Sequence, residues 1–199
     1  MKKYQLNKGI IKGILDLCDD EGIFKKDFQG ILQIRITELY GDNIFLLHSN
    51  IIGDLFFTQA EFDIRYAENY FIEESEEKMF KALNKLHRFN IYELADNFGV
   101  DVEYLGIAFG FLHEIGHMYK YIRMINKGKD IEDLDRRTKY LYQRVDEMMQ
   151  RGLDGSELYR TISQEREADL FAITFMVDHT EELIKIVQNN VEVVELEEV

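Results

Sequence analysis

The stretch His113-Glu114-Ile115-Gly116-His117 places two imidazoles and a carboxylate within a long apolar segment. Residues four apart in sequence lie on one face of a helix, with Cβ atoms about 6 Å from each other. Two imidazoles in that arrangement can bind one Zn²⁺, and Glu114 can act as a general base toward a water on the metal. The pattern therefore predicts a helix that carries a hydrolytic zinc site.

The surrounding residues predict that this helix is buried. The segment 102–125 has apolar side chains nearly all round before His113, namely Leu105, Ile107, Ala108, Phe109, Phe111 and Leu112. Such a helix belongs in the centre of a domain. Two histidines and a glutamate are costly there unless they have partners. A hydrogen-bonded pair of core histidines is the alternative to a metal.

A catalytic zinc needs a third protein ligand and one open position. The segment Ser163–Ala172, SQEREADLFA, places Glu165 and Asp169 four apart on one face of a predicted helix. Glu165 is the candidate ligand, and Asp169 could accept the N–H of a ligating imidazole and fix its tautomer. Glu167 is rotated roughly 200° away and should not reach the same metal. The alternative for this segment is a charged, solvated helix face.

Together, HEIGH and EREADLFA resemble the gluzincin metallopeptidases, most closely the ImmA/IrrE family. The resemblance implies a zincin-like fold, zinc on His113, His117 and Glu165, Glu114 as the catalytic base, and Asp169 behind a ligating histidine. It implies an endopeptidase that cuts a specific protein partner, such as a repressor or regulator. This chain departs from the pattern in its Phe109-Gly110-Phe111-Leu112 approach to the motif. It also departs in the 48 positions, with an extra charged helix, between His117 and Glu165.

The composition supports one folded domain over residues 1–190, followed by an acidic tail, 191–199, that we expect to be mobile. The chain has 199 residues, 46% of them hydrophobic, and a net charge of −14. That charge argues against non-specific binding to nucleic acid. Cys18 is the only cysteine, which excludes an internal disulfide and fits a reducing compartment. No apolar run is long enough to span a membrane, so we expect a cytoplasmic protein without a membrane partner.

The pattern of apolar residues predicts an α+β fold, in which a small antiparallel or mixed sheet packs on a mainly helical domain. Residues 28–39 fit a helix or a strand, and we expect a helix. The β region is 43–74, with the segments NIFLLHS, DLFFTQ and EFDIRYAENYFIEE. Within it, 66–74 is the candidate edge strand for binding a peptide above the active-site helix. The predicted helices are 7–18, 76–88 with Ser75 as N-cap, a pair within 90–125 that breaks near 97–99, 134–151, 156–178 with Ser156 as N-cap, and a short helix that Thr180 caps and that ends at Asn190.

Other functions remain open at this stage. Residues 91–105 resemble half of a helix-turn-helix, but Asp101 and Glu103 would face the phosphates, which makes a DNA-binding regulator the weaker alternative. A second alternative is a non-catalytic interaction protein that keeps the fold and the metal. Candidate donors to a reaction oxyanion are Tyr159, Arg160 and His179, by position only. The expected partner is a protein or peptide substrate, and the oligomeric state is left open.

Overall fold

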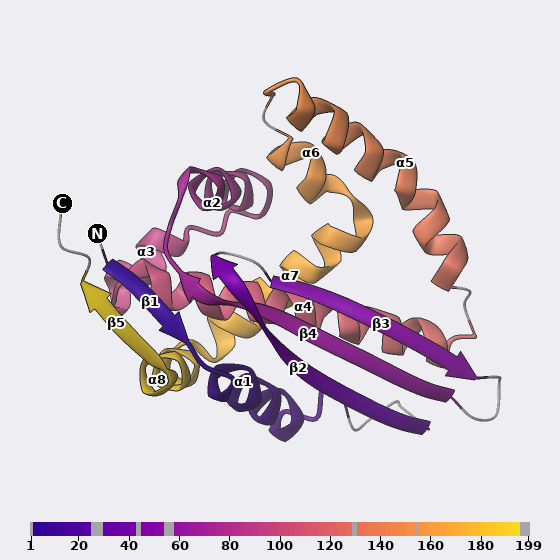
Figure 1. Cartoon of the computed structure of the whole chain (residues 1–199), viewed down its shortest axis with the longest axis horizontal. Coiled ribbons are helices and arrows are strands. Elements are labelled where there is room, and N and C mark those ends of the chain that lie inside the picture. Colours follow the sequence, from indigo (N-terminus) through magenta and orange to yellow (C-terminus); the bar gives the residue numbers. More distant parts are fainter. Residues whose placement is uncertain are drawn as a thin grey trace.

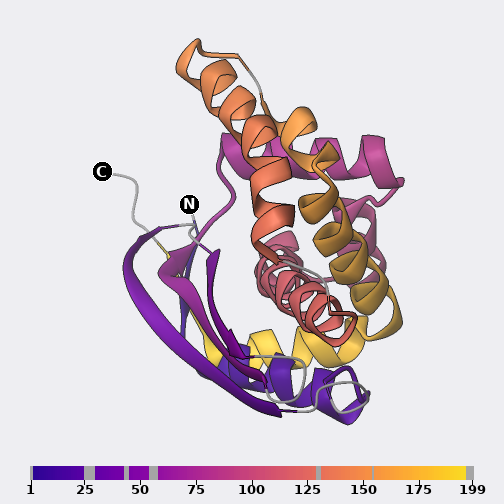
Figure 2. The ribbon, with the colours of Figure 1, turned by 90° about the vertical axis from the view of Figure 1, so that its right-hand side faces the viewer.

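The computed structural model describes residues 2–24, 30–42, 45–53, 58–128, 131–153 and 155–195. Within these residues the fold is α+β and mainly helical, with a small mixed sheet, as expected from the sequence. Figures 1 and 2 show the helices gathered on one face of the curved sheet. The strands are β1 (Lys2–Leu6), β2 (Gly30–Asp42), β3 (Phe45–Gly53), β4 (Thr58–Tyr70) and β5 (Val191–Glu195). The helices are α1 (Gly9–Asp20), α2 (Glu74–His87), α3 (Ile91–Phe98), α4 (Val102–Asn126), α5 (Ile131–Gln150), α6 (Ser156–Thr161), α7 (Ser163–Asp178) and α8 (Thr180–Asn190).

Strand β4 is the centre of the sheet. It pairs in parallel with β2 along one edge and antiparallel with β3 along the other, and its last residues pair with β1. Its side chains alternate: Phe62, Ile64 and Tyr66 are buried, whereas Asp63 and Arg65 form an ion pair on the other face. This period of two is the pattern of a sheet with one face on the core.

The helix that we expected at 28–39 is wrong, because residues 30–42 form strand β2. The segment ILQIRIT alternates apolar and polar residues, and Ile34 and Ile36 pack against the core. Pairing with β4 runs from Gly30 to Leu39 without a break. β-branched side chains fit such a pleated surface better than a helix. Residues 25–29 lie outside the described part of the chain.

The candidate edge strand, 66–74, is also wrong. Residues 66–70 end the central strand β4, and residues 71–73 are not in a strand. In the described part of the chain β3 pairs with β4 alone, so one edge of β3 is open, as are the outer edges of β2 and β5. Figure 1 shows that β3 is the strand on the side of α5 and α7. Of the segment DLFFTQ, residues 54–57 lie outside the described residues, and 58–59 begin β4.

Helix α4 carries the HEIGH motif, and its residues from Leu105 to Gly116, except Gly110, are buried. The predicted break before it is confirmed, because Gly99 ends α3 with φ of +62°, which favours glycine. Phe45 of β3 packs edge-on against Phe111, with ring centroids 4.8 Å apart. Gly110 leaves room for the same ring, since a Cβ there would lie 2.7 Å from Phe45. This packing fixes the edge strand over the motif helix.

Helix α2 begins two residues earlier than predicted. Its N-cap is Glu73 rather than Ser75, and the backbone N–H of Glu73 donates to Glu76 Oε2 at 3.1 Å. That contact completes a capping box between Glu73 and Glu76, whereas the predicted cap, Ser75, has Lys78 and no glutamate at the third position. No helix among the described residues is both long and apolar enough to cross a membrane.

The single helix predicted at 156–178 is instead two helices, α6 and α7. Ile162 between them is extended, with φ −60° and ψ 129°, and is fully buried. Ser156 is the first residue of α6, with Gly155 at the N-cap. In one unbroken helix, Arg160 and Asp169 would lie about 13 Å apart along the axis. The break turns α6 back toward α7, so that these two side chains can meet.

The expected mobile tail is wrong for residues 191–195. They form β5, which pairs antiparallel with β1 from Leu6–Val191 to Lys2–Glu195. Residues 196–199 lie outside the described part of the chain. The preceding helix α8 covers the predicted range, but His179 holds the N-cap position and Thr180 is its first residue. The Thr180 hydroxyl donates to the carbonyl of Met176 at 2.5 Å.

Candidate metal centre

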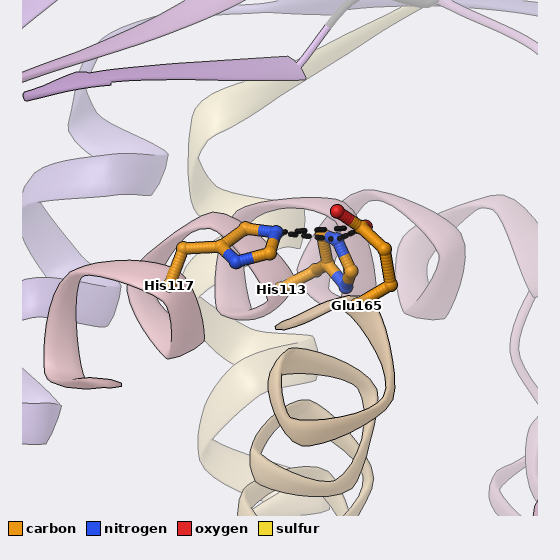
Figure 3. A group of neighbouring side chains, drawn as sticks. All are labelled: His113, His117 and Glu165. Atoms are coloured by element: carbon orange, nitrogen blue, oxygen red, sulfur yellow. Dashed lines mark hydrogen bonds and ion pairs between the residues drawn. The ribbon is translucent and has the colours of Figure 1, made fainter. Parts of the chain in front are cut away.

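Three side chains from two helices converge at one point. His113 and His117 lie one turn apart on α4, and Glu165 lies in the first turn of α7 (Figure 3). His113 Nε2 is 3.1 Å from His117 Nε2 and 3.1 Å from Glu165 Oε2, and His117 Nε2 is 3.6 Å from Glu165 Oε2. The three residues are buried or half-buried, and their ligand atoms lie within 4.8 Å of one another. They form a group that could hold a metal ion.

These distances fit tetrahedral zinc. Ligand atoms that lie 2.0–2.2 Å from a tetrahedral ion are separated from each other by about 3.3 Å. The three separations observed here, 3.1, 3.1 and 3.6 Å, bracket that value. The donor set of two imidazoles and one carboxylate is also typical of zinc sites that leave a fourth position open. The residues therefore fit the metal that the sequence predicts.

Asp169 lies behind His113, one turn beyond Glu165 on α7. Its Oδ1 is 2.9 Å from His113 Nδ1, so the carboxylate can accept that N–H and leave Nε2 for a metal. The same oxygen accepts a bond from the Arg160 guanidinium of α6, which is itself buried. Arg160 thus neutralises a carboxylate that is completely shielded from solvent.

In the metal-free protein, His113 of this cluster carries a second ring proton at neutral pH. Burial alone would lower the pKa of His113, but its hydrogen bonds with Asp169 and Glu165 outweigh burial and raise that pKa to about 9. Burial opposes ionisation of Glu165, yet the hydrogen bonds with His113 and His117 hold the pKa of this carboxyl well below its usual range. A charged imidazole between two carboxylates is the result. Binding a metal through His113 Nε2 requires that proton to leave.

We expect the metal-free protein to be less stable at about pH 10 than at about pH 7. The pKa of His113 is about 9 in the folded chain and 6.5 without the fold. Its stabilising contribution is therefore complete below pH 6.5 and is lost as the pH rises through 9. Thermal unfolding of the chelator-treated protein at both pH values measures the loss. The variant His113→Gln is the control, and an equal loss in both proteins would contradict the assignment.

Glu114 follows the first ligand on α4 and is buried, with 9% of its surface exposed. Burial raises the pKa of its carboxyl, and the neighbouring His113 and His117 partly offset that rise. A carboxylate with a raised pKa is a better acceptor of a proton at neutral pH. This environment suits the role of general base that the sequence predicts for Glu114.

Glu165 has a second set of contacts on its other oxygen. Tyr142 of α5 donates its hydroxyl to Glu165 Oε1 at 2.6 Å and lies 3.0 Å from Gln164 Oε1. Tyr159 of α6 is close to the same carboxylate, and burial together with Glu165 raises the pKa of the Tyr159 phenol. The rings of Tyr142 and Tyr159 lie 6.0 Å apart. Two tyrosines thus lie beside this carboxylate, and Tyr142 contacts the oxygen that does not face the imidazoles.

The three candidate oxyanion donors lie in different places. Tyr159 lies beside the cluster. Arg160 forms an ion pair with Asp169 and lies over the rings of Phe109 and Tyr159. His179 is not brought to the site. It packs on the ring of Phe175 and lines a groove of about 990 Å³ along α4 and α7, whose lining includes none of the three cluster residues.

Glu167 also follows the prediction, since it points away from the cluster. It is exposed on α7 and forms an ion pair with Lys120 at 3.2 Å.

Two residues near the cluster were not identified from the sequence. Tyr142 lies in a charged helix with no chemical motif, and His87 ends α2, with its Nε2 3.8 Å from Asp169 Oδ2. Among the described residues neither of these two atoms has a hydrogen-bond partner. No spacing links His87 or Tyr142 to HEIGH, so only the fold reveals them.

Gly116 permits the two motif helices to touch. A Cβ at this position would lie 2.9 Å from the Cα of Ala168 and 3.0 Å from its carbonyl oxygen. These obstructing atoms are backbone and cannot rotate away. The close contact sets the separation of α4 and α7, and hence that of the histidines from Glu165.

We expect Gly116→Ala to destabilise the fold by about 1–3 kcal/mol, because overpacking outweighs the gain of up to about 1 kcal/mol in helix propensity. Urea denaturation measures the change. Gly110→Ala on the same helix is the comparison: its new Cβ also meets a close neighbour, but that neighbour is the half-buried Phe45 ring rather than backbone, so we expect a smaller loss of stability. A stability equal to wild type in Gly116→Ala would contradict the close approach.

Comparison with protein-family models, with curated proteins and with solved structures finds no match to this chain. The resemblance to gluzincins therefore stays a prediction that rests on the two motifs.

Proposed function

We propose that the protein is a zinc-dependent endopeptidase in which His113, His117 and Glu165 hold the metal and Glu114 is the general base. The observation that carries the proposal is the convergence of three ligand atoms at separations suited to tetrahedral zinc. Glu114 is buried beside them on the same helix. Asp169 supports the first histidine from behind.

Zinc in such a site supplies a water of lowered pKa and a Lewis acid for a peptide carbonyl. The protein's own residues do the remaining work. Glu114 accepts a proton from the attacking water and passes it to the leaving amine. Asp169 keeps His113 in the tautomer whose Nε2 faces inward, and Arg160 forms the buried ion pair with Asp169.

The open edge of β3 supports binding of an extended peptide. Among the described residues, β3 pairs on one side only, and Phe45 packs it against α4 beside the motif. An extended chain can add to such an edge through backbone hydrogen bonds, which place it above the helix that carries Glu114. The substrate in this proposal is therefore a protein segment that can become extended, as in a flexible region of a partner.

Metal analysis tests the first half of the proposal. We expect close to one zinc per chain in protein purified without chelators, and loss of most of that zinc in the double variant His113→Gln/His117→Gln. Cleavage tests the second half: zinc-loaded protein is incubated with a peptide library and the products are identified by mass spectrometry. Absence of metal in wild type would refute the zinc site. Metal without cleavage of any peptide or protein would favour the non-catalytic alternative.

A further inference from the structure

Helix α5 lies in the long segment between His117 and Glu165, and the proposed chemistry assigns no role to this helix. One of its side chains nevertheless reaches a metal-binding group, because the Tyr142 hydroxyl lies 2.6 Å from Glu165 Oε1. The other oxygen of this carboxylate, Oε2, faces His113 Nε2 at 3.1 Å and His117 Nε2 at 3.6 Å. The two oxygens of Glu165 are thus divided between α5 and the imidazoles.

This division restricts how the carboxylate can turn. Glutamate has three side-chain torsions, and holding them in one arrangement costs up to about 2 kcal/mol of conformational free energy. A hydroxyl that donates to one oxygen supports that arrangement before any metal arrives. The bond is short and ends on a charged acceptor, which makes it stronger than a bond between neutral groups. Gln164 Oε1, at 3.0 Å from the same hydroxyl, is a neutral and more distant acceptor.

We propose that Tyr142 is a positioning residue that holds Glu165 in its zinc-binding orientation and thereby makes α5 part of the metal centre. The proposal rests on the zinc site proposed above. It assigns a role to the segment that makes this chain longer between its two motifs than the resembled family leads one to expect. Tyr142 does not touch the metal or a substrate in this proposal, and it acts through Glu165 alone.

Binding of a metal at Glu165 and ordering of α5 should support each other, because α5 is only weakly attached to the rest of the fold. Within the described side chains of α5, residues 139–150, Val145 is the one that is buried. It packs near Gly155, where a Cβ would lie 3.1 Å from Val145. A helix with so small a buried contact depends on its polar contacts to stay in place. Ordering Glu165 with a metal should therefore also order α5, since coupling between two sites acts in both directions.

Tyr142→Phe tests the proposal with Tyr140→Phe as the matched control. Both remove one hydroxyl from α5, but Tyr140 is 64% exposed and, two residues before Tyr142, lies roughly 200° around the helix from it. Zinc affinity is measured by competition with a chromophoric chelator, after circular dichroism shows that each metal-free variant is folded. We expect zinc to bind Tyr142→Phe about 10- to 100-fold more weakly than wild type, as for other groups that orient metal ligands. Tyr140→Phe should bind zinc like wild type.

Two further measurements separate positioning from a general structural role. In cobalt-substituted protein, the visible absorption bands should shift in Tyr142→Phe and not in Tyr140→Phe, because they report the geometry of the ligands. In wild type, added zinc should slow amide hydrogen exchange over residues 139–150 of α5. The exchange measurement needs no variant, so it decides the matter even if Tyr142→Phe does not fold.

The outcomes are distinct. Wild-type zinc affinity together with an unshifted cobalt spectrum in Tyr142→Phe would overturn the role of Tyr142 and leave the zinc site standing. Unchanged hydrogen exchange in α5 on zinc addition would overturn it as well. Failure of wild type to bind zinc would overturn both this inference and the proposed function.

Discussion

Glu114→Gln should keep its zinc and lose nearly all peptide cleavage. The amide has the shape of the carboxylate but cannot accept a proton from the attacking water. Loss of a general base lowers the rate by a factor of about 10² to 10⁴. The environment of Glu114 supports this role, because burial raises the pKa of its carboxyl and the ligand His113 is its neighbour in the chain. Zinc content and the rate of product formation are measured on the same preparation.

Glu103→Gln is the matched control for this experiment. It makes the same substitution in the first turn of the same helix, α4, far from the cluster. We expect its cleavage rate and zinc content to equal those of wild type. A Glu114→Gln variant that cleaves at the wild-type rate with full zinc would show that Glu114 is not the base.

Asp169→Asn should destabilise the protein strongly and also weaken its hold on zinc. Asp169 is fully buried and accepts bonds from Arg160 and from His113. Removing its charge leaves the buried Arg160 without a counter-ion, which typically costs about 3–5 kcal/mol. Loss of the carboxylate behind His113 should weaken zinc binding by about 10- to 100-fold. Denaturation of the metal-free protein and zinc competition measure the two effects separately.

The double variant Arg160→Leu/Asp169→Leu distinguishes the two causes. Replacing both members of a buried ion pair with apolar residues is often neutral for stability, or even favourable. We expect the double variant to recover much of the stability lost in Asp169→Asn but none of its zinc affinity, because His113 Nδ1 still lacks its acceptor. If the double variant regained both stability and zinc affinity, Asp169 would have no role in orienting His113.

The arrangement of the cluster could be foreseen because each motif lies within one turn of a helix. His113 and His117 are four apart, as are Glu165 and Asp169, so each pair must share a face wherever its helix packs. Glu165 and Asp169 then reach the two nitrogens of a single imidazole, Nε2 and Nδ1 of His113. Burial of the helix with HEIGH also followed from its apolar surroundings.

Features that depend on contacts between distant segments could not be foreseen. Residues 30–42 form a strand because β4 lies beside them, and 191–195 form another because β1 does. Ile162 breaks a helical pattern since its side chain is buried in the core, which no local propensity indicates. The contact of Tyr142 with Glu165 depends on how α5 packs against α4 and α6. For residues 30–42 the local pattern fitted both a helix and a strand, and for the other features the sequence spacing gave no indication.

The open edge of β3 has a consequence for the timing of any cleavage. A chain that adds to this edge must be fully extended along it, at about 3.3 Å per residue, with its own backbone hydrogen bonds broken. A target whose cleavage region is helical, or already paired in a sheet, cannot meet that demand while it stays folded. The moment of cutting would then be set by unfolding of the target, so that a stable partner is spared until stress or loss of a ligand loosens it.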